Sequence, residues 1–181
     1  LNRATDTTRQ PGSTFKILAA YSAALDAGGL TLASVQDDAP YTYAGANGKS
    51  VNNYDRRYRG FTTLREAITD SINIVTVKTL AQAGVSLGWQ YVQEYGFTTV
   101  DSRDMNEALA LGGITQGVSN LELTAAYAAI ANQGTYIRPK FYTKILDHDG
   151  NVLIDNTTPE SHTVIKDTTA WLLTSAMEDV M

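Results

Sequence analysis

The feature that most constrains the fold is a long apolar run near the start of the chain. From Ser13 onward the sequence reads STFKILAAYSAALDA, and Gly28 and Gly29 follow it. Apolar residues occupy nearly every side of a helix built from this run, whereas a surface helix has a single apolar stripe. Glycine is the usual residue just after a helix C-terminus. The run therefore predicts a buried helix that other parts of the chain must surround.

The composition is that of one globular domain and excludes several kinds of protein. The chain has 181 residues, of which 43% are hydrophobic and 18% charged, so it can build a core. A net charge of −5, with one short basic cluster at residues 56–59, argues against nucleic acid as a partner. No apolar run reaches the roughly 18 residues of a membrane-spanning helix, and we expect the chain itself to be soluble. It has no cysteine, which excludes disulfides and thiolate metal sites.

The two ends of the sequence suggest a piece of a longer protein. The chain opens with Leu1 and stops in DTTAWLLTSAMEDVM, where a helical pattern continues without glycine, proline or any other stop signal. We expect that further residues precede and follow it.

Helical signals dominate the rest of the chain. Residues 62–70 have a capping arrangement, with Thr62 or Thr63 before Glu66, and helical patterns continue over residues 72–84, 86–96 and 119–134. Residues 36–61 are rich in Gly, Asn, Tyr and Asp and predict a long loop or a weak hairpin. Apolar strands on both sides of Asp149 and Gly150 predict a β-hairpin near residues 142–155.

The first chemical signal is a serine and a lysine three positions apart, Ser13 and Lys16. A chain of this length contains about one such pair by chance. Here, however, the serine lies at the first turn of a buried helix, where the helix dipole favours negative charge on an attacking oxygen. Lys16 lies on the same face and is partly desolvated, which suits it to accept the serine proton. A capping serine beside a lysine that reaches the solvent is the alternative reading.

The second signal is Ser-x-Asn, for which the chain offers two candidates. One is Ser50 with Asn52 in the long loop, and the other is Ser71 with Asn73 at the junction of two predicted helices. We favour the second, because a helix junction is a rigid support and catalytic groups must be held within a fraction of an ångström. The alternative role of Ser71 is an N-cap of the following helix, which is compatible with catalysis.

The sequence contains no complete metal-binding or phosphate-binding motif. A phosphate-binding loop ending at Lys49 and Ser50 would require glycine at position 43, which is Tyr43. The stretch DHDGN has its glycine too early for a calcium loop. His148 and His162 lie in polar, turn-like surroundings and are best interpreted as surface residues. We expect neither a metal ion nor a cofactor.

Three stretches together resemble one known family. NRATDTTRQPGSTFK, NNYDRRYRGFTTLREAITDSINIVTVKTLAQAG and LALGGITQGVSNLELTAAYAAIANQGTY are similar, in this order, to the transpeptidase domain of class A penicillin-binding proteins. That family combines Ser-x-x-Lys with a second Ser-x-Asn-type motif and a Lys-Thr-Gly. The resemblance covers most of the chain and favours the catalytic reading of Ser13 and Lys16.

The resemblance implies a D,D-transpeptidase that cross-links the stem peptides of peptidoglycan. Ser13 would be the nucleophile and Lys16 its base. Ser71 would pass the proton to the leaving D-alanine, and Asn73 would bind Lys16 and the substrate amide. β-Lactam antibiotics would acylate Ser13, and the backbone N–H of Ser13 would supply half of the oxyanion hole.

The sequence departs from the family pattern in one respect, because it contains no Lys-Thr-Gly or Lys-Ser-Gly. We therefore expect residues 1–181 to be a partial transpeptidase domain that is poorly active or inactive by itself. The expected fold is mainly α-helical with a small antiparallel hairpin. It would be the helical portion of the α+β fold that penicillin-binding proteins share with serine β-lactamases, without most of the central sheet.

Class A membership further implies a membrane-anchored parent protein with an upstream glycosyltransferase domain, acting on the extracytoplasmic face of the bacterial cell membrane. Two alternatives share parts of the pattern. A β-lactam sensor or class D β-lactamase would use the same serine and lysine, and a helical interaction module would have kept the sequence without the activity.

Overall fold

A buried helix runs through the centre of the protein, which confirms the prediction from the apolar run. The computed structural model describes residues 2–44 and 48–180. In it, the central helix has three consecutive parts of different pitch: the 3-10 turn η1 (Gly12–Thr14), the π-helical segment η2 (Ile17–Tyr21) and the α-helix α1 (Ser22–Asp26). Every residue from position 15 to position 24 is buried. The single lysine of this stretch, Lys16, is therefore enclosed by protein.

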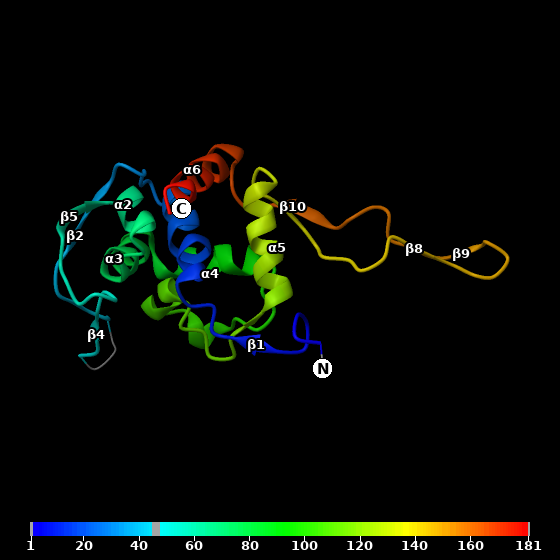
Figure 1. Ribbon diagram of the computed structural model, residues 1–181, viewed down its shortest axis with the longest axis horizontal. Coiled ribbons are helices and arrows are strands. Elements are labelled where there is room, and N and C mark those ends of the chain that lie inside the picture. Colours follow the sequence, from blue (N-terminus) through cyan, green and yellow to red (C-terminus); the bar gives the residue numbers. More distant parts are fainter. Residues whose placement is uncertain (1, 45–47, 181) are drawn as a thin grey trace.

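Shorter helices surround this central helix (Figure 1). They are α2 (Leu64–Thr69), α3 (Asn73–Ala83), α4 (Val85–Glu94), η3 (Ser102–Asp104), η4 (Glu107–Leu111), α5 (Asn120–Ala131) and α6 (Asp167–Glu178). Of these, α3, α4 and η4 pack against η2, and α3, α4 and α6 pack against α1. One apolar core joins the central helix to its neighbours, so the predicted buried helix and its predicted coverings form one unit.

Local sequence signals place the starts of two helices. Thr63 and Glu66 form a capping box at α2, and Ser119 and Glu122 form another at α5. In each box the side chains of the two residues accept the backbone N–H groups that the first helical turn leaves without partners. The predicted helix at 62–70 is therefore confirmed with Thr63 as its cap, and the helix at 119–134 with Ser119.

Strand pairing is more extensive than the sequence suggested. The strands form five antiparallel pairs within residues 2–44 and 48–180, and none of the five joins another. They are β1 (Thr8–Arg9) with β6 (Val118–Ser119), β2 (Val35–Asp38) with β5 (Gly60–Thr63), β3 (Tyr41–Thr42) with β4 (Ser50–Val51), β7 (Thr135–Ile137) with β10 (Ser161–Thr163), and β8 (Lys144–Leu146) with β9 (Val152–Asp155).

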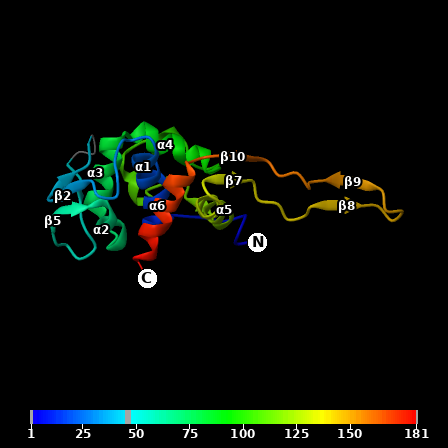
Figure 2. The ribbon, with the colours of Figure 1, turned by 90° about the horizontal axis from the view of Figure 1, so that it is seen from above.

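The expectation of a small hairpin near residues 142–155, with a long loop or a weak hairpin over residues 36–61, was thus too simple. The segment from residue 35 to residue 63 contains the β3–β4 pair nested inside the β2–β5 pair; residues 45–47 of this segment lie outside the described residues. The β1–β6 pair joins Thr8 to Ser119, and no local sequence pattern predicts a pairing between segments so far apart. The hairpin predicted near residues 142–155 is present as β8 and β9, and it projects far from the helical body (Figure 2).

No described helix is both long enough and apolar enough to span a membrane. His148 and His162 are both solvent-exposed, as predicted.

Candidate active site

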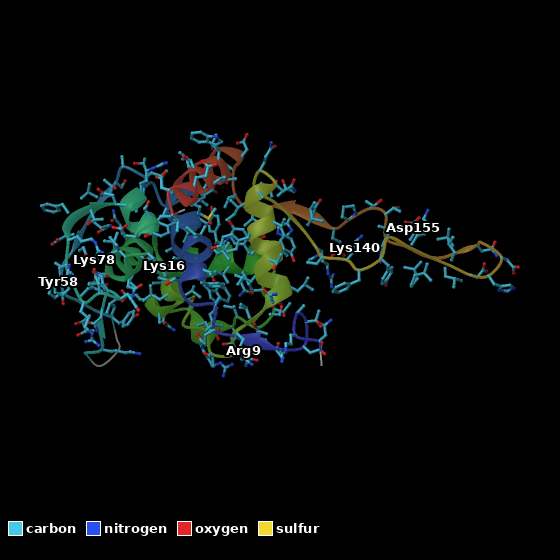
Figure 3. All side chains as sticks on the ribbon, in the orientation of Figure 1. Arg9, Lys16, Tyr58, Lys78, Lys140 and Asp155 are labelled. Atoms are coloured by element: carbon cyan, nitrogen blue, oxygen red, sulfur yellow. The ribbon has the colours of Figure 1, made fainter. Side chains whose placement is uncertain are left out.

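The Lys16 ammonium is the centre of a compact polar cluster. Its Nζ donates hydrogen bonds to the backbone oxygen of Ser71 (2.6 Å), to Ser71 Oγ (2.9 Å) and to Asn73 Oδ1 (2.6 Å). Figure 3 shows Lys16 inside the helical body, far from the projecting hairpin. The central helix and the junction between α2 and α3, which lie more than fifty residues apart in sequence, thus meet at one amine.

Burial changes the acid–base behaviour of this amine. Lys16 is only 3% exposed, so its side chain does not reach into solvent, and that part of the alternative reading is wrong. Desolvation disfavours the charged form of a lysine. It lowers the pKa of Lys16 to about 8, which leaves a useful fraction of free amine near neutral pH. A lysine in this state can accept a proton from a nearby hydroxyl group.

Ser13 lies one turn before Lys16, at the solvent-exposed start of the central helix. The residue in the N-cap position is Pro11, and Gly12, with φ of 57°, makes the bend that leads into the first turn. Ser13 is inside the turn, so it is not the helix cap that the alternative reading required. In the described part of the chain, the hydrogen bonds of the Lys16 ammonium go to Ser71 and Asn73, and Ser13 is solvent-exposed.

Ser71 has an uncommon backbone conformation. Its φ is 51°, in the left-handed region that favours glycine. The N–H of Ser71 donates to Ile68 O (3.2 Å) and that of Ile72 to Ala67 O (2.9 Å), which are the two hydrogen bonds of a Schellman motif at the end of α2. The position after such a helix end is usually glycine, because other residues are strained there. Here the position is occupied by Ser71, whose carbonyl and hydroxyl oxygens both accept hydrogen bonds from Lys16.

The N-cap of α3 is Ile72, so the alternative role of Ser71 as N-cap is wrong. The two candidate Ser-x-Asn motifs lie side by side. Asn73 Nδ2 donates to the backbone oxygen of Asn52 (2.8 Å), which turns Asn73 Oδ1 toward Lys16. Asn52 contributes a main-chain carbonyl, while Ser50 is part of β4. The structure therefore brings Lys16, Ser71 and Asn73 together by their side chains.

A second segment, residues 112–114, holds the chain that leads into Ser13, although the sequence assigned no role to it. The side chain of Gln10 forms two hydrogen bonds with the backbone of Ile114: Nε2 donates to the carbonyl, and Oε1 accepts from the N–H at 3.1 Å. A Cβ added to Gly112 would lie 2.6 Å from both N and O of Gly12, so the two backbones cross in direct contact. Paired glycines at 112 and 113 were the sequence signal for such a close approach.

Comparison with known proteins identifies the family of the chain. Residues 1–181 match the penicillin binding protein transpeptidase domain. Penicillin-binding protein 1F of Bacillus subtilis is 39% identical over 173 residues, which are 96% of this chain and 23% of the relative. Penicillin-binding protein 1A of Neisseria flavescens is 40% identical over 156 residues, covering 83% of this chain and 19% of the relative.

Solved structures show the same fold. The crystal structure of penicillin-binding protein 1A from Haemophilus influenzae superimposes with a TM-score of 0.86 at 28% identity, over 100% of this chain and 31% of that protein. An imipenem acyl-enzyme complex of penicillin-binding protein A from M. tuberculosis gives a TM-score of 0.85 at 22% identity, over 99% of this chain and 45% of that protein.

The fold and the matched relatives define a transpeptidase-type penicillin-binding domain. The chain belongs to the penicillin-binding protein transpeptidase family, and its relatives carry the class A names 1A and 1F. It spans about a fifth of the length of these curated relatives.

Proposed function

We propose that this chain carries the nucleophile and the general base of a peptidoglycan D,D-transpeptidase. The observation that carries the proposal is the buried Lys16, which is held by Ser71 and Asn73 and follows the exposed Ser13 by one helical turn. Family membership makes acyl transfer through a serine ester the reaction to consider first. The lowered pKa of Lys16, about 8, suits the base that such a reaction needs.

In the proposed acylation step, Ser13 Oγ attacks the carbonyl carbon between the two terminal D-alanines of a stem peptide. The serine proton passes to the free amine of Lys16 as the new C–O bond forms. Lys16 Nζ lies 2.9 Å from Ser71 Oγ, so the proton can continue through the Ser71 hydroxyl to the nitrogen of the departing D-alanine. The C–N bond then breaks and leaves an ester on Ser13. Asn73 keeps the lysine in place and is available to the substrate amide.

In the second step, an amine from a neighbouring stem peptide attacks the ester carbonyl, gives up a proton and regenerates the Ser13 hydroxyl. A β-lactam enters the first step in the same way, since its strained amide is opened by Ser13 and leaves a covalent adduct. A related protein has been seen as an acyl-enzyme with imipenem, and we propose that Ser13 is the acylated residue in this chain.

Other expectations concern the protein as a whole, and we propose them on the class A resemblance. The parent protein would be membrane-anchored, would act on the outer face of the bacterial cell membrane and would carry an upstream glycosyltransferase domain. The 181 residues would be part of its transpeptidase domain, because the Lys-Thr-Gly motif of the family does not occur in them. That motif supplies an oxyanion donor, whose loss typically costs about a hundredfold or more in rate. Residues 1–181 alone should thus react with penicillin at least about a hundredfold more slowly than the protein at its natural length.

The direct test is Ser13→Ala in the protein at its natural length, with fluorescent penicillin as the probe. We expect covalent labelling to disappear while the thermal unfolding midpoint stays near that of the wild type, because Ser13 is exposed and is not a helix cap. Labelling that persists would show that another residue is acylated. Steady hydrolysis of a chromogenic β-lactam by the wild type would instead favour a β-lactamase, and absence of any wild-type label a non-catalytic module.

A further inference from the structure

Asn53 lies directly behind the active-site asparagine, although no motif pointed to it. Its side chain is 5% exposed and comes from the loop that follows β4. Its Oδ1 accepts hydrogen bonds from the backbone N–H groups of Asn73 (3.0 Å) and Ile74 (3.2 Å). These N–H groups belong to the first turn of α3, where a helix leaves its donors without internal partners. Asn53 therefore caps α3 from another part of the chain.

The helix has no cap of its own that could replace this contact. Its N-cap residue is Ile72, whose side chain has no hydrogen-bond acceptor. Asparagine is among the strongest helix caps, but it normally acts from the N-cap position itself. Here the capping group is twenty residues away in sequence. The backbone position of Asn73, and with it the carboxamide that holds Lys16, thus depends on residue 53.

A buried carboxylate fixes which way the Asn53 amide points. Asn53 Nδ2 donates to Asp38 Oδ1 (2.8 Å), to Asp38 Oδ2 (2.9 Å) and to the backbone oxygen of Arg57 (2.8 Å). Asp38 is fully buried, and its Oδ2 also accepts from the backbone N–H of Arg59 (2.9 Å). Three oxygens accept from this side of the amide, so its nitrogen faces Asp38 and its oxygen faces the backbone N–H groups of α3. A continuous series of contacts therefore runs from Asp38 through Asn53 and Asn73 to Lys16.

We propose that Asn53 is a positioning residue for the acylation step: it fixes the first turn of α3 so that Asn73 Oδ1 meets Lys16 Nζ, and Asp38 sets the orientation of its amide. The inference rests on the proposed function, and it names a residue that touches neither the substrate nor the reacting atoms. The contact it maintains is the 2.6 Å hydrogen bond between Asn73 and Lys16. A displacement of about 1 Å would break this bond, and misplacement on that scale can cost about a hundredfold in rate.

The test is rapid-mixing labelling of the protein at its natural length with fluorescent penicillin. Two quantities are measured: the limiting rate constant of acylation and the fraction of molecules labelled at the end. In Asn53→Ala the rate constant should fall by about tenfold to a hundredfold, while the labelled fraction stays near that of the wild type, because folded molecules still carry Ser13. If Asn53 only stabilised the fold, the labelled fraction would fall and the remaining molecules would react at the wild-type rate. That result would overturn the proposal.

A matched control removes another asparagine cap. Asn106 caps η4 by accepting from the N–H of Ala108 (2.9 Å), and it has no contact with the Lys16 cluster in the described residues. Asn106→Ala should lower the unfolding midpoint without changing the rate constant. An equal slowing in both variants would show that loss of a cap anywhere slows acylation, and it would contradict a specific role for Asn53.

A double-mutant cycle tests whether Asn53 acts through Asn73. In the background of Asn73→Ala, the added change Asn53→Ala should slow acylation by no more than about twofold, because the group it positions is already absent. Independent, multiplying effects would contradict the proposal. If Asn53→Ala does not fold, the same cycle is run with Asp38→Asn, which keeps the shape of the side chain and leaves Asn53 present but free to turn its amide.

Failure of this inference can be told apart from failure of the proposed function. If the wild type takes no label on Ser13, the proposed function is wrong. If the wild type is labelled on Ser13 and Asn53→Ala reacts at the same rate, only the positioning role is wrong.

Discussion

The Lys16 cluster and the β8–β9 hairpin are held together in opposite ways. The cluster joins residues more than fifty positions apart, and its lysine is almost completely buried. The hairpin is held by contacts between near neighbours, such as the hydrogen bonds from the N–H groups of Asp149 and Asn151 to Asp147 Oδ1. Every residue of β8 and β9 is exposed, and in Figure 3 Asp155 lies on the projecting part of the chain, away from the body that contains Lys16.

This difference predicts where substitutions act. In the cluster, each polar group is placed by partners from other segments, so a single change disturbs the acid–base groups or the backbone beneath them. In the hairpin, a change affects at most its strand neighbour, because nothing in the described residues packs over either strand.

Replacement of Lys16 should have the largest effect. Lys16→Ala removes the proposed base, and a positioned base contributes about a hundredfold or more, so acylation should slow by at least that factor. In the wild type the rate should rise with pH, because the base acts only when deprotonated and the pKa of Lys16 is about 8. About one molecule in ten carries the free amine at pH 7, so the rate should reach half of its maximum at pH ~8 and level off towards pH ~9. Stopped-flow labelling from pH 6 to 9 measures both.

Lys16→Ala should react slowly, and its acylation rate should no longer rise with pH. Asn73→Ala is expected to slow acylation by a similar factor, whereas Asn52→Ala should not, since Asn52 provides a main-chain carbonyl that any residue can supply. A pH rise that survives in Lys16→Ala would assign the titration to another group, and a larger effect at Asn52 would favour the other Ser-x-Asn motif.

Gly112 should be the most sensitive position for stability near Ser13. Gly112 has φ of 71°, and an added Cβ would lie 2.6 Å from the backbone of Gly12. Gly29 has almost the same φ, 72°, with no atom within 4 Å of the added carbon. Gly29→Ala should cost about 1 to 2 kcal/mol from backbone strain alone, and Gly112→Ala clearly more because the crossing must open. Chemical denaturation measures both, and equal losses would show that the contact with Gly12 adjusts freely.

The part of the structure that sequence could predict is the part with local causes. The capping box at Thr63, the hairpin turn at Asp149 and Gly150, and the buried central helix all have their determinants within a few residues of one another. The cap of α3 by Asn53 has its two partners twenty residues apart, and neither position carries a cap motif. Long-range pairings of this kind depend on how the helices pack, which a pattern in one segment does not encode.

In the candidate site, too, the sequence predicted the features with local causes and not the long-range contacts. The spacing of Ser13 and Lys16 and the Ser-x-Asn motif indicated the residues, but not that the lysine would bond to both the carbonyl and the hydroxyl of Ser71. The sequence DSIN at residues 70–73 also gives no indication that Ser71 has a left-handed backbone, because the glycine that usually marks such a helix end is absent. A serine in a glycine position points to a conflict between stability and chemistry, which can be measured.

A pair of substitutions at Ser71 isolates that conflict. Ser71→Ala and Ser71→Gly both remove the hydroxyl that accepts from Lys16, so both should slow acylation to the same extent. Only glycine relieves the left-handed backbone, so Ser71→Gly should be more stable than Ser71→Ala by about 1 kcal/mol. Thermal and denaturant unfolding of the two variants give the difference. An alanine variant as stable as the glycine variant would show that the conformation of Ser71 costs nothing.

The smallest effect is expected in the hairpin, and one chemical change made in both regions measures the contrast. Leu153 in β9 is 63% exposed and Leu18 in the central helix is 0% exposed. Leu18→Ala should cost about 2 to 5 kcal/mol, because it leaves a cavity in a close-packed core. Leu153→Ala should change the free energy of unfolding by no more than about 0.5 kcal/mol. It should leave the acylation rate unchanged, since Leu153 lies on a strand whose residues are all exposed. A loss above about 1 kcal/mol at Leu153, measured in the protein at its natural length, would mean that another part of that protein covers the hairpin. Both regions would then be buried in the protein at its natural length, the Lys16 cluster by the described residues and the hairpin by another part of that protein. The hairpin would be exposed only when residues 2–44 and 48–180 are considered alone.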